Sequence, residues 1–240
     1  MSQLSRFFYN GALTENSTVT LDADSARHIW QVLRMDAGDQ ISLTDGKGTV
    51  ARGSIFSAER HKCNVLIEQS AFYPWEGGKL HLGVGFTKNN SRNEWLLEKA
   101  TELGVASIIP IKAARSEKTH MRHDRWEKIL QSAVLQSQQY YIPELAEITP
   151  LEKLPAMFKK APLRLIAHCI HDAERVPFSK MLKPATETII LIGPEGDFTP
   201  DEVNLCMQHG FKPISLGNQR LRTETAAIAA AAYFNVMNAK

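Results

Sequence analysis

The sequence is poor in cysteine, in net charge and in long apolar runs, and each shortage excludes a class of protein. Its cysteines, Cys63, Cys169 and Cys206, stand far apart without a Cys-x-x-Cys pair, so neither a disulfide framework nor a zinc ribbon is expected. With a formal net charge of +2, any contact with a polyanion must depend on local clusters of positive charge. No apolar stretch approaches the roughly 18 residues that a membrane helix needs.

Several motifs of common enzyme classes are absent as well. The sequence contains no Gly-x-Gly-x-x-Gly fingerprint, no Gly-x-Ser-x-Gly elbow and no Walker loop, which disfavours a dinucleotide enzyme, a hydrolase and an NTPase. His168, Cys169 and His171 have loosely metal-like spacing, but no second pair of ligands stands nearby, so we expect no metal. The first residues lack the apolar run of a secretory signal, and we expect a cytoplasmic protein.

Residues 1–73 have the pattern of a small antiparallel β-barrel that forms a domain of its own. Short segments of alternating apolar and polar residues are separated by Gly and Asp turns, as is typical of barrels. These segments are 19–21, 40–43, 49–56 and 63–68. One helix interrupts them, with Asp24 as its expected N-cap and Ile29, Trp30 and Leu33 at helical spacing.

Residues 74–240 change to alternating strands and helices, which predicts an α/β domain with a mostly parallel sheet. The predicted strands are 80–86, 106–111, 163–168, 188–192 and 213–216. Ser91 and Glu94 have the spacing of a capping box at the start of the first helix of this domain.

Three of these strands are followed by irregular loops. The loops cover 167–171, 192–198 and 216–226. In open α/β sheets, ligands bind beyond the carboxyl ends of the strands, so we expect the three loops to form one pocket. Gly193 and Gly196 allow a ligand to approach the backbone closely, and Thr199 with Glu202 predicts a capping box at the next helix. A plain strand-to-helix turn is the alternative for this second loop.

The third loop combines arginines, a glutamate and two threonines before an alanine-rich helix. Either Thr223 or Thr225 can cap that helix, but capping does not explain Arg220, Arg222 and Glu224. Charges beside buried elements are costly unless they are paired or used in function, so the alternative to a functional site is a structural Arg–Glu pair. The helix itself is apolar almost all round, which predicts burial in a core or at a subunit interface.

Positive charge occurs in local groups. Arg6, Arg27 and Arg34 lie in the first domain, and Arg115 and Arg122 belong to a basic stretch of the second. Salt-dependent contact with phosphate groups is a reasonable use for these side chains. For the stretch in the second domain, a solvated helix face fits equally well.

The motifs of the second and third loops resemble those of the bacterial small-subunit ribosomal RNA uracil-N3 methyltransferases, a family of the knotted SPOUT class. The residues that carry this resemblance are Gly193-Pro194-Glu195-Gly196, Leu216-Gly217 and Leu221-Arg222-Thr223-Glu224-Thr225-Ala226. The likeness covers the whole chain. Residues similar to the family's PUA-like domain are Arg6-Phe7-Phe8, His28, Val32-Leu33-Arg34, Gly38-Asp39 and Asp45-Gly46-Lys47-Gly48, and residues 98–105 are similar to its first methyltransferase helix.

The resemblance implies an α/β SPOUT domain with a mostly parallel sheet and a deep C-terminal trefoil knot, preceded by a PUA-like β-barrel. It implies a homodimer that binds S-adenosylmethionine and methylates N3 of one uridine in the decoding region of 16S ribosomal RNA, on the small subunit. The alternatives are the same fold acting on another RNA, such as transfer RNA, or a non-catalytic RNA-binding assembly factor.

The same resemblance implies roles for individual residues. Arg222 and Glu224 are the expected catalytic residues: Arg222 stabilises the anionic edge of uracil, and Glu224, with Glu195, orients that arginine or accepts the N3 proton. The expected cofactor-binding residues are Ala167, His168, Ile192, Gly193, Pro194, Glu195, Gly196, Leu216, Gly217, Leu221, Thr225 and Ala226. The expected RNA-binding residues are Arg6, Arg27, Arg34, Arg115 and Arg122.

Two positions depart from the family pattern. Asp197 stands where the family often has a second glycine, and Gln139 lies in a long helix where the family often has an arginine. The first difference concerns the cofactor loop, and the second concerns contact with RNA.

Overall fold

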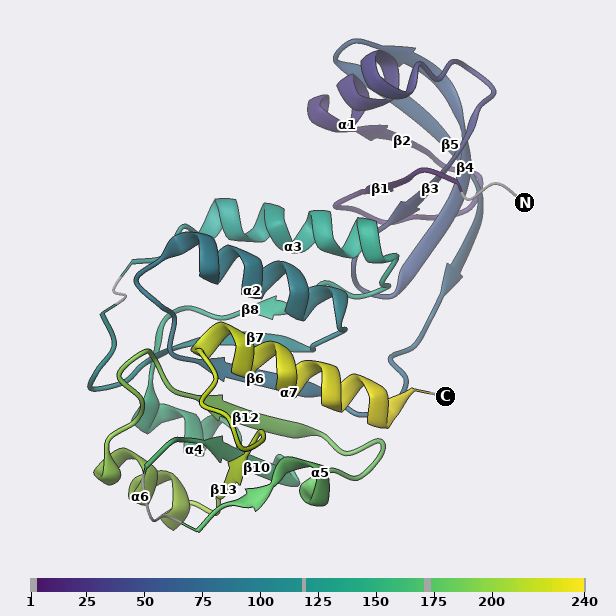
Figure 1. Cartoon of the computed structure of the whole chain (residues 1–240). Coiled ribbons are helices and arrows are strands. Elements are labelled where there is room, and N and C mark those ends of the chain that lie inside the picture. Colours follow the sequence, from purple (N-terminus) through teal and green to yellow (C-terminus); the bar gives the residue numbers. More distant parts are fainter. Residues whose placement is uncertain (1–3, 118–119, 171–173, 240) are drawn as a thin grey trace. The chain divides into compact units, whose positions relative to one another are not determined.

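The computed structural model describes residues 4–117, 120–170 and 174–239, which form two compact units (Figure 1). Unit 1 comprises residues up to 75 together with 134–142, and unit 2 comprises 76–133 and the residues from 143 onward. The segment 134–142 belongs to unit 1 because it bonds to the N-terminal strands. The amide of Gly48 donates to the carbonyl oxygen of Tyr140 over 3.0 Å, and the rings of Tyr73 and Tyr140 stack with centroids 4.2 Å apart.

Unit 1 is built on a five-stranded sheet with the order β1-β3-β4-β5-β2. The strands are β1 (Arg6–Phe8), β2 (Thr18–Leu21), β3 (Gln40–Thr44), β4 (Thr49–Glu59) and β5 (Lys62–Phe72). β1 pairs with β3 in parallel, and the other pairs are antiparallel. In β2 the side chains of Val19 and Leu21 are buried while those of Thr18 and Thr20 are exposed, so one face of the strand packs on the core. The predicted small β-domain is confirmed, with β1 as an unpredicted strand.

The helix of unit 1 begins earlier than the sequence pattern indicates. α1 (Ala23–Arg27) is capped by Asp22, whose carboxylate accepts a 2.8 Å hydrogen bond from the amide of Ser25. The prediction of Asp24 as N-cap is therefore wrong. Asp24 lies inside the first turn, where its negative charge is favourable near the helix N-terminus. The chain continues directly into the π-helix η1 (His28–Leu33).

Unit 2 contains an eight-stranded sheet whose pairs are all parallel, with the order β11-β13-β10-β12-β6-β7-β8 and with β9 beside β7. The strands are β6 (Leu80–Val84), β7 (Ser107–Lys112), β8 (Glu144–Leu145), β9 (Thr149–Pro150), β10 (Leu163–Ala167), β11 (Val176–Pro177), β12 (Thr188–Ile192) and β13 (Lys212–Ser215). The predicted parallel α/β sheet is confirmed.

Helices cover both faces of this sheet (Figure 1). They are α2 (Asn90–Glu102), α3 (His123–Ser137), η2 (Leu151–Lys153), α4 (Leu154–Met157), α5 (Phe178–Met181), α6 (Pro200–Gln208) and α7 (Thr223–Asn238). α7 packs against α2, β6 and β12, while Ile189 and Leu191 of β12 join a core with residues of α4 and α6. Ile190 between them is also buried and points to the opposite face, because side chains alternate along a strand.

α7 is only partly buried in the single chain. Ala227, Ala230 and Phe234 are buried, whereas Tyr233 is 51% and Val236 is 71% exposed. Burial on all sides in the core of one chain, the first of the two alternatives, is therefore wrong, and burial at a subunit interface stays a prediction. The threading of this C-terminal segment into a knot stays a prediction. Within the described part of the chain, no helix has the length and apolarity needed to cross a membrane.

Candidate functional site

The carboxyl ends of β10, β12 and β13 open into one cavity of about 400 Å³ in unit 2. The predicted cofactor-binding residues that line it are Ala167, His168, Ile192, Gly193, Pro194, Glu195, Leu216, Gly217, Leu221 and Ala226. Arg222 and Glu224 line it too, whereas Gly196 and Thr225 do not. The three loops thus meet as the strand-end rule predicts. His171 lies outside the described residues.

Asp197 joins the first loop to the second. Its backbone has φ of 61°, in the left-handed region that glycine adopts most easily and that Asp tolerates. One carboxylate oxygen accepts a 2.7 Å hydrogen bond from the amide of Cys169, and the other accepts one of 2.8 Å from the amide of Phe198. Behind it, Thr199 and Glu202 form the predicted capping box of α6, which is confirmed.

Thr223 joins the third loop to the second. Its hydroxyl group donates a 2.9 Å hydrogen bond to the carbonyl oxygen of Gly193, and its side chain is buried. The N-cap residue of α7 is Arg222, which makes no side-chain capping bond. The prediction that Thr223 or Thr225 caps α7 is therefore wrong, because the hydroxyl of Thr223 serves a longer-range contact and Thr225 already lies inside the helix.

Gly196 does not line the cavity but contacts Arg115. The guanidinium of Arg115 donates a 2.7 Å hydrogen bond to the carbonyl oxygen of Gly196. A Cβ atom on Gly196 would lie 3.0 Å from the Cβ of Arg115, so a side chain here would require Arg115 to shift. Arg115, predicted to bind RNA, thus also supports the second loop.

His168 is a buried polar residue in the cavity wall. Its Nδ1 accepts a 3.2 Å hydrogen bond from the amide of Ile170, so the neutral ring carries its proton on Nε2. Nε2 is buried without a hydrogen-bond partner among the described residues. Burial lowers the pKa of His168, the carboxylate of Asp197 raises it less, and the positive charge of Arg175 adds to the lowering.

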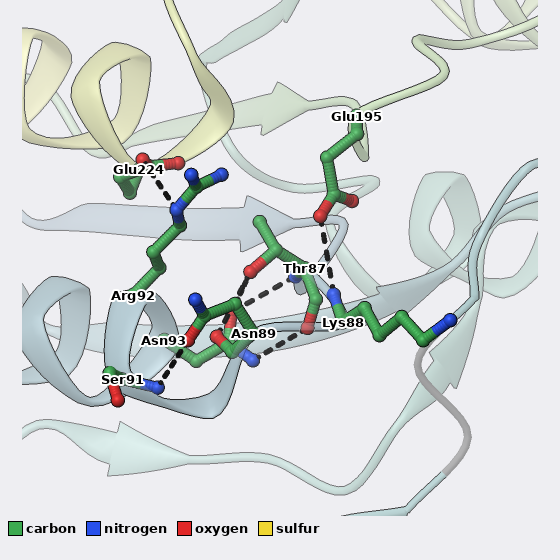
Figure 2. Close-up of polar contacts among 8 residues, drawn as sticks. All are labelled: Thr87, Lys88, Asn89, Ser91, Arg92, Asn93, Glu195 and Glu224. Atoms are coloured by element: carbon green, nitrogen blue, oxygen red, sulfur yellow. Dashed lines mark hydrogen bonds and ion pairs between the residues drawn. The ribbon is translucent and has the colours of Figure 1, made fainter.

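Glu224, in the first turn of α7, is 8% exposed, and its partner is Arg92 of α2 (Figure 2). Arg92 Nε lies 3.6 Å from Oε1 of Glu224, while Oε2 is buried without a hydrogen-bond partner among the described residues. The carboxylate of Glu195 points to another segment, where it accepts a 3.2 Å hydrogen bond from the amide of Lys88.

Sequence reasoning missed Arg92 and Arg175, which both line the cavity. Arg175 donates a 2.7 Å hydrogen bond to the carbonyl oxygen of His168. Arg92 lies between Ser91 and Glu94, which the sequence pattern predicted to form a capping box. That box is not formed: the N-cap of α2 is Asn89, and Glu94 binds Arg125 through two hydrogen bonds of 2.6 and 2.7 Å. The position of α2 directly after β6, at the same sheet edge, was the available signal.

The remaining arginines predicted to bind RNA have different surroundings. In unit 1, Arg6 donates a 2.9 Å hydrogen bond to the carbonyl oxygen of Gln138, and burial lowers its pKa. Arg27 and Arg34 are exposed, and Arg34 ends η1 with φ of 53°. In unit 2, Arg122 is exposed just before α3. RNA contact by these side chains stays a prediction.

Comparison with known proteins identifies the family. Residues 75–235 match a family model described as an RNA methyltransferase domain, and residues 21–68 match one described as an RNA methyltransferase PUA domain. A ribosomal RNA small subunit methyltransferase E from Bacillus subtilis is 28% identical, with 91% of this chain and 90% of that protein covered.

Solved structures agree with these matches. The crystal structure of a probable rRNA-methyltransferase from Porphyromonas gingivalis is 35% identical, with a TM-score of 0.91 and 98% of each chain covered. A ribosomal RNA small subunit methyltransferase E from Neisseria gonorrhoeae, bound to S-adenosyl methionine, is 28% identical, with a TM-score of 0.85 and 98% of each chain covered. The chain therefore belongs to the family of RNA methyltransferases that carry a PUA domain.

Proposed function

We propose that this protein transfers a methyl group from S-adenosylmethionine to N3 of one uridine in the decoding region of 16S ribosomal RNA, on the small subunit. The observation that carries the proposal is the buried carboxylate of Glu224, with one oxygen unpartnered among the described residues, in the wall of a cavity formed by three strand-end loops. The small-subunit ribosomal RNA methyltransferases among the relatives support the choice of RNA.

The residues of the cavity fit S-adenosylmethionine. A volume of about 400 Å³ is in the range of pockets that hold ligands of this size. The unpartnered Nε2 of His168 offers a hydrogen-bond donor to the cofactor. The predicted residues that line the cavity, which exclude Gly196 and Thr225, would hold the cofactor largely through their backbone.

The chain's residues must make N3 of uracil nucleophilic, because N3 carries a proton. When bound, S-adenosylmethionine supplies the methyl carbon, which bonds to N3 as its bond to sulfur breaks and that electron pair stays on sulfur. Arg222, exposed at the cavity, stabilises the negative charge that develops on O2 or O4 of uracil. Glu224 supports this step by orienting an arginine or by accepting the N3 proton. The target uridine is turned out from its neighbours, because its Watson–Crick edge must face the cavity.

The rest of the proposal concerns partners. Exposed Arg27, Arg34 and Arg122 contact RNA phosphates, and Arg6 and Arg115 contribute beside their intramolecular bonds. The protein works as a cytoplasmic homodimer, in which the exposed face of α7 is available to a second copy.

Transfer of labelled methyl groups tests this function. The protein is incubated with labelled S-adenosylmethionine and either small subunits, naked 16S ribosomal RNA or transfer RNA, and the products are digested and mapped by mass spectrometry. One 3-methyluridine in 16S ribosomal RNA is the expected result. Methylated transfer RNA alone would assign another RNA, and cofactor binding without transfer to any of the three would indicate an RNA-binding assembly factor.

Replacement of Arg222 tests the assignment of that residue. Arg222→Ala is expected to bind S-adenosylmethionine normally in calorimetry and to lose about 10²-fold or more in kcat. Methylation by this variant at the wild-type rate would remove Arg222 from the mechanism.

A further inference from the structure

Arg92 and Glu224 form an ion pair in the wall of the cavity, from two helices that are far apart in the sequence (Figure 2). Arg92 Nε lies 3.6 Å from Oε1 of Glu224. The Arg92 side chain is 37% exposed and lines the cavity together with Glu224. A buried carboxylate is costly unless it is paired, and Arg92 is the cation that the structure places beside this one.

The backbone that carries Arg92 is fixed by its neighbour in sequence. Asn93 is buried, and its side-chain oxygen accepts hydrogen bonds from the amide and the hydroxyl group of Thr87, over 2.9 and 3.1 Å. Its side-chain nitrogen donates to the carbonyl oxygen of Thr87 over 2.8 Å. Asn89 then caps α2 by accepting from the amide of Ser91. This closed network holds the first turn of α2 in one position, as a precisely placed side chain requires (Figure 2).

The charges of the two helices also point to a function for the pair. A cation in the first turn of a helix is unfavourable because the helix N-terminus is itself positive. Arg92 lies in the first turn of α2, whereas Glu224 lies in the first turn of α7, where a negative charge is favourable. The local stability of α2 therefore does not explain an arginine at position 92, and its contact with Glu224 does.

The two oxygens of Glu224 have different surroundings. Oε1 faces Arg92, while Oε2 is buried and unpartnered among the described residues. No ion pair or hydrogen bond joins Glu224 to Arg222 in the described part of the chain, and Glu195 is bonded to the amide of Lys88. Of the two roles open to Glu224, orientation of Arg222 therefore loses support, and acceptance of a proton gains it.

We propose that the carboxylate of Glu224 accepts the N3 proton and that Arg92 is the positioning residue that holds this carboxylate through Oε1. This inference rests on the proposed function and deepens it. The proton leaves N3 for the carboxylate of Glu224 as the new carbon–nitrogen bond forms, and it later passes from the carboxyl group to water. Arg92 acts on Glu224 and not on the cofactor or the RNA.

A double-mutant cycle on the full-length protein tests the pair. Glu224→Gln is expected to lower kcat by about 10²- to 10⁴-fold, and Arg92→Ala is expected to lower it by about 10²-fold. In both variants the KM for RNA and the calorimetric Kd for S-adenosylmethionine are expected to stay within about twofold of the wild-type values. Because Arg92 acts through Glu224, the double variant is expected to be no slower than Glu224→Gln alone. Arg92→Lys, which keeps the charge but loses the planar guanidinium, is expected to retain more activity than Arg92→Ala.

Thermal unfolding without cofactor or RNA gives an independent readout. Arg92→Ala leaves the buried carboxylate unpaired and is expected to lower the Tm, and adding Glu224→Gln in the same chain is expected to restore part of the loss. The matched control is Arg125→Ala, which breaks the pair between the exposed Arg125 of α3 and the half-buried Glu94 of α2 and is expected to leave kcat unchanged.

The outcomes separate this inference from the function on which it rests. Wild-type kcat in Arg92→Ala, an additive loss in the double variant, or a raised KM for RNA with normal kcat would overturn the role of Arg92. Absence of methyl transfer by the wild-type protein would overturn the proposed function itself, and the inference with it.

Discussion

The hydroxyl group of Thr223 donates a 2.9 Å hydrogen bond to the carbonyl oxygen of Gly193, a residue 30 positions earlier in the chain. This bond joins the first residue of α7 to the loop after β12, and both residues line the cavity. Thr223→Val keeps the shape of the side chain but leaves the buried carbonyl group without this donor. We expect a loss of about 1–3 kcal/mol in the free energy of unfolding, measured by urea denaturation.

The same variant is expected to bind S-adenosylmethionine more weakly in calorimetry, because two walls of the cavity are no longer joined. Thr225→Val is the matched control, since Thr225 is exposed and does not line the cavity. If the two variants have equal stability and equal affinity, the bond between Thr223 and Gly193 has no role in the site.

The sequence was sufficient to predict the meeting of the three loops but not the contacts that join them. Because the carboxyl ends of parallel strands lie at one sheet edge, the loops that carry Gly193 and Glu224 could be placed together from the sequence. Threonine before a helix is a common N-cap residue, so the sequence pattern predicted a capping role for Thr223 and not its hydrogen bond to Gly193. Arg92 was missed for a similar reason: it lies within a predicted local capping pattern, and that pattern gives no sign of its ion pair with Glu224 of another helix.

The grouping of residues 134–142 with unit 1 has the same kind of cause. Helical periodicity describes how a segment turns about its own axis but not which unit it packs against. Two contacts place this segment in unit 1: the ring of Tyr140 stacks on that of Tyr73, and the amide of Gly48 donates to the carbonyl oxygen of Tyr140. These residues are far apart in the sequence, so no local pattern relates them.

We expect the hydrogen bonds of the Asp197 carboxylate to offset the conformational strain of its left-handed backbone. Its φ of 61° is unfavourable for most side chains, but its carboxylate accepts bonds from the amides of Cys169 and Phe198. Asp197→Ala keeps the backbone cost and loses both bonds, whereas Asp197→Gly loses the bonds and relieves the cost. We therefore expect the glycine variant to be more stable than the alanine variant by about 1 kcal/mol, measured by urea denaturation.

Both variants at position 197 are also expected to bind S-adenosylmethionine more weakly, because the first and second loops lose their connection through Cys169. An alanine variant as stable as the glycine variant would show that the left-handed backbone at this position is not retained. Wild-type affinity in both would show that the connection does not shape the cavity.

Arg34 and Arg6 are predicted to affect different properties of the protein. Arg34 is exposed at the end of η1, and asparagine suits the left-handed backbone at this position. Arg34→Asn is therefore expected to weaken RNA binding and to reduce the magnitude of the slope of log affinity against log salt concentration by about 1. Arg6 is half-buried and bonded to Gln138, so Arg6→Ala is expected to lower the Tm more than Arg34→Asn does. Filter binding at several salt concentrations and thermal unfolding distinguish the two, and an unchanged salt slope in Arg34→Asn would remove Arg34 from the RNA contact.

Buried His168 and half-buried His81 are predicted to make stability depend on pH below neutrality. Burial lowers the pKa of His81 and of His168, in each case as the largest cause. For His81 the hydrogen bond and charge of Glu187 raise the pKa, but not enough to cancel this effect. In the unfolded chain the pKa of histidine is about 6.5. The unfolded state therefore binds more protons between that value and the lowered native pKa values, and stability falls as the pH decreases through this window.

Unfolding by urea between pH 8 and pH 5 measures this dependence. Protonation of His168 also places a proton on Nδ1, which then no longer accepts the hydrogen bond from the amide of Ile170, so acid is expected to disturb the cavity wall as well. His168→Asn keeps an acceptor near the position of Nδ1 and has no group that titrates in this range. It is expected to lose less stability than the wild type between pH 7 and pH 5. An unchanged pH dependence in both His168→Asn and His81→Asn would mean that other groups control the acid response.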